Sequence, residues 1–546
     1  MVSTGEQSDR TPAVVLTGAA AQSRSARSRR RPRPVLSVVV VLVALLFLAP
    51  FGYLVLEAIG SGSRFVDIIT SSSIRRPLAN SLVLAGTVSL TCAAVGTLLA
   101  VLVMRTDLPW RGSWRLLLAL PLVMPSFVAA TAFVAAFGRG GLIPALPRPE
   151  GFWGAYVVLT LLSYPYVYLP VVGRLSSTSP SAEEASRLLG RGPLRTLLRV
   201  LLPQLRPAVL GGALLVFLYV LSDFGAVSLL RYDTITRVLY ASRLLDPALS
   251  LTLGLLLGAI ALAVALAAAR IAGDDVTGRS RAGRLPRYAL RRWRWPSCLL
   301  VALPVAAGLA APVAVFVVWV VRGSSTVGVG YSGLGDDLGF LAEPTLGSSA
   351  AALAAAVAAM VVVLPVAYLS VRRATWWTGL SAAVVSSVFA LPGIVVALAL
   401  VAWAVSAPRS FAPLYQSFPL LILGYVLHFG AQSLRSSQAA IGSVPAALDE
   451  SASVLGAGAR RRFVTIDLPL ILPGVLAGGG LVLLSTLKEL PATLLLAPTG
   501  FETLATTIWN AAEDGFYAEV GIASLVLLLL SALLTWILVL RPAQRG

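Results

Sequence analysis

Long apolar runs dominate this sequence and strongly restrict the folds that it can adopt. The hydrocarbon core of a bilayer is about 30 Å thick, a distance that about 20 apolar helical residues cross. Hydrophobic residues make up 57% of the chain and charged residues only 12%. These runs predict an all-α polytopic membrane protein with about 12 transmembrane helices. The expected spans are 35–59, 80–104, 115–137, 153–173, 208–229, 247–270, 297–321, 348–371, 379–405, 415–433, 474–496 and 518–540.

The positive charges lie mainly in the short segments between these runs. The net charge is +19, and Lys488 is the only lysine among 43 basic residues. With the first segment inside, 32 arginines fall in inside segments and 10 in outside loops. Because positive loops stay on the cytoplasmic side, both termini should be cytoplasmic. The arginines therefore indicate orientation in a bacterial cytoplasmic membrane, with lipid and not nucleic acid as their partner.

Few residues in the chain suit catalysis or metal binding. Cys92 and Cys298 fall within apolar runs and form no motif with His428, the only histidine. We therefore expect no catalytic residue, no disulfide framework and no firm metal site. The chain also lacks the Gly-Lys-Ser/Thr of a phosphate-binding loop, so we expect it to bind no cofactor. If ATP drives this protein, a separate subunit hydrolyses it.

A polar motif occurs twice, 266 residues apart. In each copy an acidic residue precedes a glycine by six positions, and Leu-Pro follows the glycine by twelve and thirteen. The copies run from Glu184 through Gly190 to Pro203 and from Glu450 through Gly456 to Pro469. Other residues recur at offsets of 266 or 267, namely Pro207 and Pro473, Arg105 and Arg372, and Pro125 and Pro392. Two parallel repeats of six spans, related by an axis along the membrane normal, are predicted.

The repeat divides the chain into predicted domains. A disordered basic cytoplasmic tail precedes the first repeat, a cytoplasmic linker joins the repeats, and a short cytoplasmic tail follows the second. The boundaries are 1–34 for the first tail, 35–270 for the first repeat with its motif loop at 174–207, 271–296 for the linker, 297–540 for the second repeat with its loop at 434–473, and 541–546 for the last tail.

Each motif loop should contain a short helix. Ser181 and Glu184 have the spacing of a capping box, and Gly190 should end that helix. In the second copy Pro445 suits the first helical position and Gly456 the end. Arginines follow both glycines, so each helix should stand out from the membrane on a basic return segment.

These motifs resemble the EAA loop of ABC-transporter permeases of the binding-protein-dependent import type, the loop that docks on a cytoplasmic ATPase. The resemblance implies two copies of a cytoplasmic ABC ATPase, one on each loop, with ATP bound there. It also implies an extracytoplasmic substrate-binding protein on the opposite face. The implied ATPase-docking residues are Glu184, Ala185, Gly190, Glu450, Ser451 and Gly456.

The segments after the loops resemble a narrower group. Residues 222–236 and 487–504 look like the two halves of fused ferric-iron permeases, and the likeness covers about 35–540. The resemblance implies ferric iron as the substrate. Thiamine, polyamine, sulfate or aminoethylphosphonate permeases share the architecture and stay as alternatives. A passive channel and a membrane-embedded enzyme are the alternatives from other classes.

Two carboxylates are candidates for the transport pathway. Asp223 corresponds to Glu489, and each lies two residues before a helix breaker, Gly225 or Pro491. Ionisable residues in spans are costly and usually face a cavity, and broken helices often line one. Together the carboxylates would suit a hard cation such as ferric iron. The alternative is structural, with Glu489 held by polar neighbours, Asp223 ending a helix and Lys488 reaching to the interface.

Overall fold

The structure is a computed structural model that describes residues 34–60, 62, 67–68, 71–138, 140–177, 181–190, 192–272, 288–322, 338–535 and 537. Within these ranges every regular element is a helix, and the only β-type pairings are two isolated bridges. The predicted all-α polytopic class is therefore confirmed. The predicted tails, apart from Pro34, and most of the predicted linker lie outside the described residues.

The first repeat contains the elements up to α13. They are α1 (Pro34–Gly60), α3 (Ser72–Arg105), α4 (Arg111–Leu117), η1 (Leu120–Val123), α5 (Ser126–Ala136), α6 (Gly151–Ser163), α7 (Pro165–Ser177), α8 (Ser181–Leu188), α9 (Pro193–Thr196), η2 (Leu197–Leu201), α10 (Leu202–Ser222), α11 (Gly225–Leu229), α12 (Ile235–Ser242) and α13 (Pro247–Ala272).

The second repeat follows the same plan. Its elements are η3 (Arg291–Trp293), α14 (Arg294–Val305), η4 (Ala306–Ala310), α15 (Ala311–Arg322), η5 (Leu338–Leu341), α17 (Ala342–Arg372), α18 (Trp376–Val388), α19 (Gly393–Ser406), η6 (Arg409–Leu414), α20 (Phe418–Ser443), α21 (Ala446–Val454), α22 (Ala459–Arg462), η7 (Phe463–Asp467), α23 (Leu468–Leu487), α24 (Pro491–Leu496), α25 (Leu504–Asp514) and α26 (Tyr517–Thr535).

The number of membrane-spanning helices differs from the expected twelve. Among the described residues, nine helical segments are long and apolar enough to cross a bilayer, and two bent helix pairs raise the number to as many as 11. α20 has 26 residues but is not among them, and its second half carries polar residues such as Gln432 and Arg435. Twelve crossings are thus not confirmed.

Two predicted spans are bent and not straight. Span 115–137 consists of two parts at 89°, and span 379–405 of two parts at 102°. Each bend precedes a proline, Pro125 or Pro392, which caps the second helix of its pair. Proline lacks an amide proton and disfavours helical backbone in the residue before it, and Met124 is accordingly extended. Spans 208–229 and 474–496 also break, because α10 and α23 end before short helices α11 and α24.

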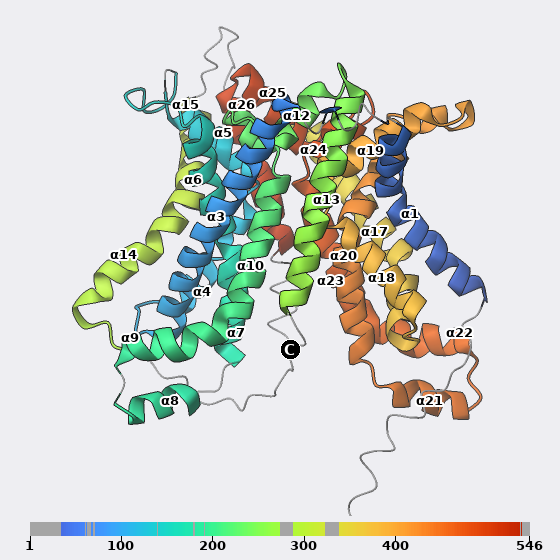
Figure 1. Cartoon of the computed structure of the whole chain (residues 1–546), viewed down its shortest axis with the longest axis horizontal. Helices are drawn as coiled ribbons and strands as arrows, with labels where there is room; N and C mark the ends of the chain where they lie inside the picture. Colours follow the sequence, from blue (N-terminus) through green and yellow to red (C-terminus); the bar gives the residue numbers. More distant parts are fainter. Residues whose placement is uncertain are drawn as a thin grey trace, which may run out of the picture.

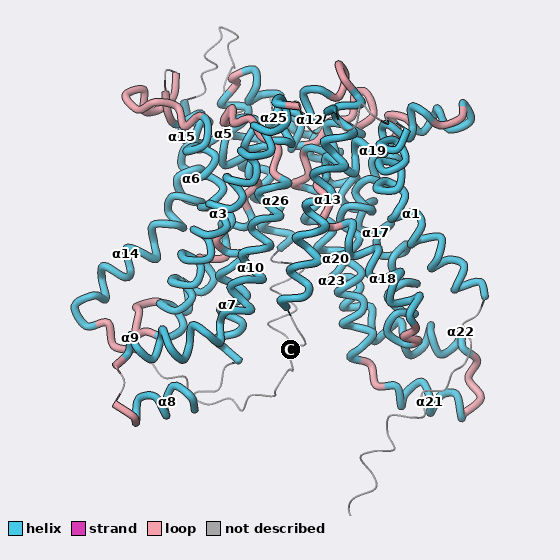
Figure 2. The backbone as a smooth tube through the Cα atoms, viewed as in Figure 1, coloured by secondary structure: helices cyan, strands magenta, loops and turns pink. Residues whose placement is uncertain are grey.

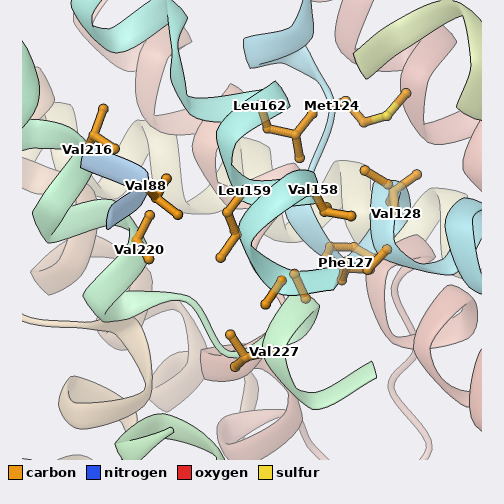
Figure 3. Packing of buried hydrophobic residues seen from close by; sticks show 14 of the residues in the cluster. Val88, Met124, Phe127, Val128, Val158, Leu159, Leu162, Val216, Val220 and Val227 are labelled. Atoms are coloured by element: carbon orange, nitrogen blue, oxygen red, sulfur yellow. The ribbon is translucent and has the colours of Figure 1, made fainter. Parts of the chain in front are cut away.

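Each repeat has the same core of three packed helices. In the first repeat α3, α7 and α10 pack together, and in the second α17, α20 and α23 do. Gly212 and Gly478 allow this closeness, since a Cβ would lie 2.7 Å from the Tyr166 carbonyl oxygen or 2.9 Å from the Ser436 Cβ. Small residues at such contacts let helix backbones approach in membranes. Figure 3 shows the apolar packing around α3, α6 and α10, with Val88 beside Val220.

The first helix of each repeat packs against the other repeat. α1 lies against α17, α18 and α19, and its buried Val43 and Phe47 belong to the core of the second repeat. α15 lies against α5, and its buried Phe316 joins the core that contains α3 and α10. Figure 1 shows α1 and α14 on opposite flanks of the molecule. The two repeats are therefore interlocked.

The molecule has two different ends. α8 and α21 lie at one end, where the repeats are splayed, and α12 and α25 lie at the other, where the repeats meet (Figure 1). Loops gather mainly at these two ends, while the body between them is helical (Figure 2). We call them the docking end and the far end. The splayed arrangement places the two motif loops far apart.

Candidate functional site: two docking loops and a central cavity

The two motif loops have matching backbones. α8 covers the first motif and α21 the second, and Gly190 and Gly456 follow them with φ of +73° and +80°. This left-handed backbone favours glycine, so both glycines end their helices as predicted. Pro445 is the N-cap of α21 and not its first residue, because its ψ of 133° is not helical. The side chain of Ser181, expected in a capping box, lies outside what the structure describes.

Both loops expose their predicted docking residues together with an unexpected apolar pair. Glu184, Ala185, Gly190, Glu450, Ser451 and Gly456 are all exposed. Immediately before the glycines, Leu188 and Leu189 are 89% and 75% exposed, and Val454 and Leu455 are 88% and 85% exposed. Exposed apolar residues on a polar loop are typical of a partner surface. The signal was available in the sequence, since the two pairs are 266 residues apart.

A buried ion pair anchors the first loop. Glu183 of α8 lies 2.9 Å from the Arg105 guanidinium at the end of α3, and both side chains are almost fully buried. The Tyr288 hydroxyl, from the segment that leads into the second repeat, donates to the other Glu183 oxygen at 3.4 Å. The Tyr288 amide also donates to the Arg105 carbonyl at 2.7 Å. The sequence analysis singled out Glu184 and missed its buried neighbour.

A different pair anchors the second loop. Arg372, which corresponds to Arg105, lies 3.1 Å from Asp467 in the return segment η7. The Tyr368 hydroxyl donates to the same carboxylate at 2.7 Å, and Arg372 also donates to the Val444 carbonyl before α21 at 3.1 Å. In the first repeat the position of Asp467 is occupied by the buried Leu201. The repeat thus keeps the arginine, and Asp467 has no acidic counterpart in the first repeat. The side chain of Asp449, which corresponds to Glu183, is not among those that the structure describes.

A cavity of about 1030 Å³ lies between the two repeats. Residues at equivalent positions line its two walls, which agrees with the predicted parallel repeat. The pairs are Tyr166 and Gln432, Tyr219 and Ser485, Ser222 and Lys488, Asp223 and Glu489, and Phe224 and Leu490. The structure therefore brings both predicted pathway carboxylates to one cavity.

Each carboxylate also caps a short helix. Asp223 Oδ1 accepts the amide protons of Ala226 and Val227 at 3.0 and 3.3 Å, and Glu489 Oε1 accepts that of Ala492 at 3.1 Å. Asp223 lies directly after α10, as the structural alternative expected. Such caps satisfy amide groups that would otherwise be unpaired at a helix start.

The wall from the second repeat differs chemically from the wall of the first. Gly393 lies beside Glu489 and His428, since a Cβ there would be 2.6 Å from Glu489 Oε1 and 3.3 Å from His428 Nε2. The equivalent residue in the first repeat is Ser126, which also lines the cavity. Lys488 lines the cavity as well, and is partly exposed there. No group of three metal-binding side chains occurs within the described residues.

Aromatic side chains pack between the cavity and the far end. The Phe224 and Trp509 rings lie 5.2 Å apart, so this cluster joins both repeats. The next residue, Gly225, has no room for a side chain, because a Cβ there would lie 2.6 Å from the Cβ of Phe127 and 3.5 Å from Leu490 Cδ2. In the other direction Arg174 and Pro207, which lie toward the docking loops, line the wall.

Comparison with known proteins agrees with this geometry. The family described as "Binding-protein-dependent transport system inner membrane component" matches residues 93–274 and 363–541, once in each repeat. The chain belongs to this family. It is therefore an ABC transporter permease of the binding-protein-dependent type and a multi-pass inner membrane protein.

Relatives of this permease include ferric and molybdenum permeases. It is 28% identical over 510 residues to the Fe(3+)-transport system permease protein FbpB 2 of Haemophilus influenzae, covering 92% of this chain and 97% of that one. It is 25% identical to the ferric transport system permease protein FbpB of Actinobacillus pleuropneumoniae, covering 86% and 72%. It is 34% identical over 206 residues to the molybdenum transport system permease protein ModB of Mycobacterium tuberculosis, and this match covers 35% of this chain and 78% of that one. The resemblance to fused ferric permeases is confirmed.

Proposed function

We propose that this permease is the transmembrane subunit of an importer for ferric iron. An extracytoplasmic binding protein delivers the substrate to the far end, and two copies of a separate cytoplasmic ATPase dock on α8 and α21. ATP is bound by those partners and not by this chain. Both termini and the docking end face the cytoplasm.

The central cavity is the observation that carries this proposal. Its walls are equivalent residues of the two repeats, aromatic rings pack between it and the far end, and its lining extends toward the end with the docking loops. A site between repeats suits alternating access, in which one repeat rocks against the other. Asp223 and Glu489 then lie beside the substrate pathway, each at the start of a short helix that could move with its repeat.

The exposed surface of α8 and α21 supports ATPase docking. Each helix presents an acidic residue, a small residue and an apolar pair ahead of a left-handed glycine. A side chain at either glycine would strain the backbone and occupy space at the contact. A passive channel has no need of such a pair of surfaces.

Two kinds of relative bear on the substrate. Two relatives that match most of this chain carry ferric transport in their names, which favours iron. A second candidate is an oxyanion, favoured by the molybdenum relative and by the basic residues Arg174, Arg435 and Lys488 in the cavity wall.

Uptake by whole cells tests the proposal. Cells that lack this permease should accumulate little ⁵⁵Fe from a ferric source, and the restored gene should recover uptake only when the ATPase is also present. Uptake that persists without the ATPase would indicate a channel. If the restored gene recovers uptake of ⁹⁹Mo-molybdate or ³⁵S-sulfate but not of ⁵⁵Fe, iron is not the substrate, while the importer function stands.

Labelling of introduced cysteines tests the orientation. The substitutions are Ser443→Cys, at an exposed residue before α21, and Ser410→Cys, at an exposed residue in η6. The native Cys92 and Cys298 are buried. In intact cells a membrane-impermeant maleimide should label the cysteine at 410 and spare the one at 443. The reverse pattern would invert the proposed orientation.

A further inference from the structure

The charged groups that line the cavity are predominantly basic. Arg174, Arg435 and Lys488 line it together with the two carboxylates Asp223 and Glu489. His428 also lines it. Three positive groups and two negative ones thus line one partly enclosed cavity, where charges interact more strongly than in water.

Both carboxylates already have bonding partners. Asp223 Oδ1 accepts two backbone amide protons and Glu489 Oε1 accepts one, so part of each negative charge stabilises a helix start. A ferric ion prefers several oxygen ligands at one point. The described part of the chain offers no cluster of three His, Cys, Asp or Glu side chains that could hold it.

Lys488 is in the opposite situation. It is the only lysine of the chain, it lies on the cavity wall next to Glu489, and it forms no ion pair with any residue that the structure describes. Burying a charged group is costly unless it is paired. An unpaired ammonium at a substrate cavity is therefore suited to an anionic substrate.

From this arrangement, and resting on the proposed importer function, we infer that the cavity binds its substrate as an oxygen-donor anion and that Lys488 contacts it. Ferric iron then crosses as an anionic complex with oxygen-donor ligands and not as a bare ion. The complex brings its own metal ligands, which removes the need for a metal site in the wall, and its outer oxygens accept hydrogen bonds from Lys488.

The sign of the transported charge tests this inference directly. The complete transporter, with its ATPase and binding protein, is reconstituted in proteoliposomes and supplied with ⁵⁵Fe as ferric citrate and with ATP. A voltage-sensitive dye reports the potential as ⁵⁵Fe accumulates. The compartment on the ATPase side should become negative. A positive compartment, or iron uptake without a change in potential, would overturn the inference.

Two substitutions on opposite walls test the same point. Lys488→Gln removes a positive charge and Ser222→Asp adds a negative one at the equivalent position of the first repeat. Both should lower ⁵⁵Fe uptake, Lys488→Gln by about tenfold, as expected for losing a charge-assisted hydrogen bond. The matched variants Lys488→Arg and Ser222→Asn leave the charge unchanged and should lose much less. Higher uptake in either charge-changing variant would favour a bare cation.

The same proteoliposomes separate this inference from the iron assignment. Uptake of ⁹⁹Mo-molybdate or ³⁵S-sulfate in place of ⁵⁵Fe, lost in Lys488→Gln and kept in Lys488→Arg, would overturn iron as the substrate and support the anion site. Iron uptake that moves positive charge and is unchanged by substitution of Lys488 would keep iron as the substrate and overturn the anion site. The amount of each variant in the membrane, measured by immunoblot, excludes loss of folding as the cause.

Discussion

In the first docking loop the helix itself carries the anchoring acid, Glu183, which pairs with Arg105. In the second loop the matching arginine, Arg372, pairs with Asp467 in the return segment, and the side chain of Asp449, which corresponds to Glu183, lies outside what the structure describes. The left-handed glycines and the exposed apolar pairs are nevertheless the same in both loops. The outer surface that a partner would meet is thus repeated, while the described ion pairs hold different parts of the two loops.

This difference teaches how each loop is joined to the transmembrane helices. α8 is tied directly to α3 and, through Tyr288, to the segment that leads into the second repeat. The described anchor of the second loop holds η7, which continues into α23. Because Arg372 ends α17, the counterpart of α3, we expect a movement of an ATPase to reach α3 through helix α8 of the first loop and α17 through the return segment of the second.

The largest expected effect comes from the two left-handed glycines that both docking loops share. Changing both Gly190 and Gly456 to Asp puts a side chain on left-handed backbone, which glycine adopts more easily, and adds negative charge to both docking surfaces. Uptake should be abolished and the ATPase should no longer co-purify with the permease. Gly442→Asp, at an exposed glycine with ordinary backbone before α21, is the control. Wild-type recovery of the ATPase with the double variant would refute docking at these glycines.

The anchors should differ in strength. Arg105→Ala removes the arginine from a buried ion pair, a change that typically costs about 3–5 kcal/mol. Arg372→Ala should cost less, because the Arg372 side chain is 17% exposed and that of Arg105 is fully buried. Thermal unfolding of the purified permease measures both. Equal losses of stability would mean that the two loops are anchored equally well.

The apolar pairs should matter for binding and not for stability. Replacing Leu188 and Leu189, or Val454 and Leu455, by Ser removes exposed apolar area, and each side chain buried by a partner contributes about 1.5–3 kcal/mol. ATPase affinity should fall in both variants by similar amounts. Leu244 and Leu245, an equally exposed pair at the far end, provide a control in which affinity stays unchanged. A loss confined to one loop would show that the ATPase copies bind differently.

The smallest effects should come from the two tyrosines. Tyr368→Phe removes a hydrogen bond of 2.7 Å to Asp467, worth about 1 kcal/mol. Tyr288→Phe removes a longer one of 3.4 Å to Glu183 and should cost less. The order is read from melting temperatures of the single variants. A larger loss at Tyr288 would identify the linker contact as the principal support of α8.

The sequence was sufficient for features that depend on local chemistry. Apolar length predicted helices, and the 266-residue offset located both docking motifs and the carboxylates that meet at the cavity. Features set by packing were missed. Hydropathy does not distinguish a straight span from one bent before Pro125, and it does not reveal which of the neighbours Glu183 and Glu184 is buried. The ion pair of Arg372 with Asp467 has no counterpart in the first repeat, so the repeat could not predict it.

The crossing of α1 to the second repeat has a consequence for biosynthesis. α1 is made early, but its packing partners α17, α18 and α19 emerge only after some three hundred further residues. For much of that interval the only one of its main partners to be made is α13 of the first repeat. Its sequence suits this, because α1 has the highest mean hydropathy of the candidate spans in the described chain. A segment that is made long before most of its neighbours is thus the one that least needs them to stay inserted.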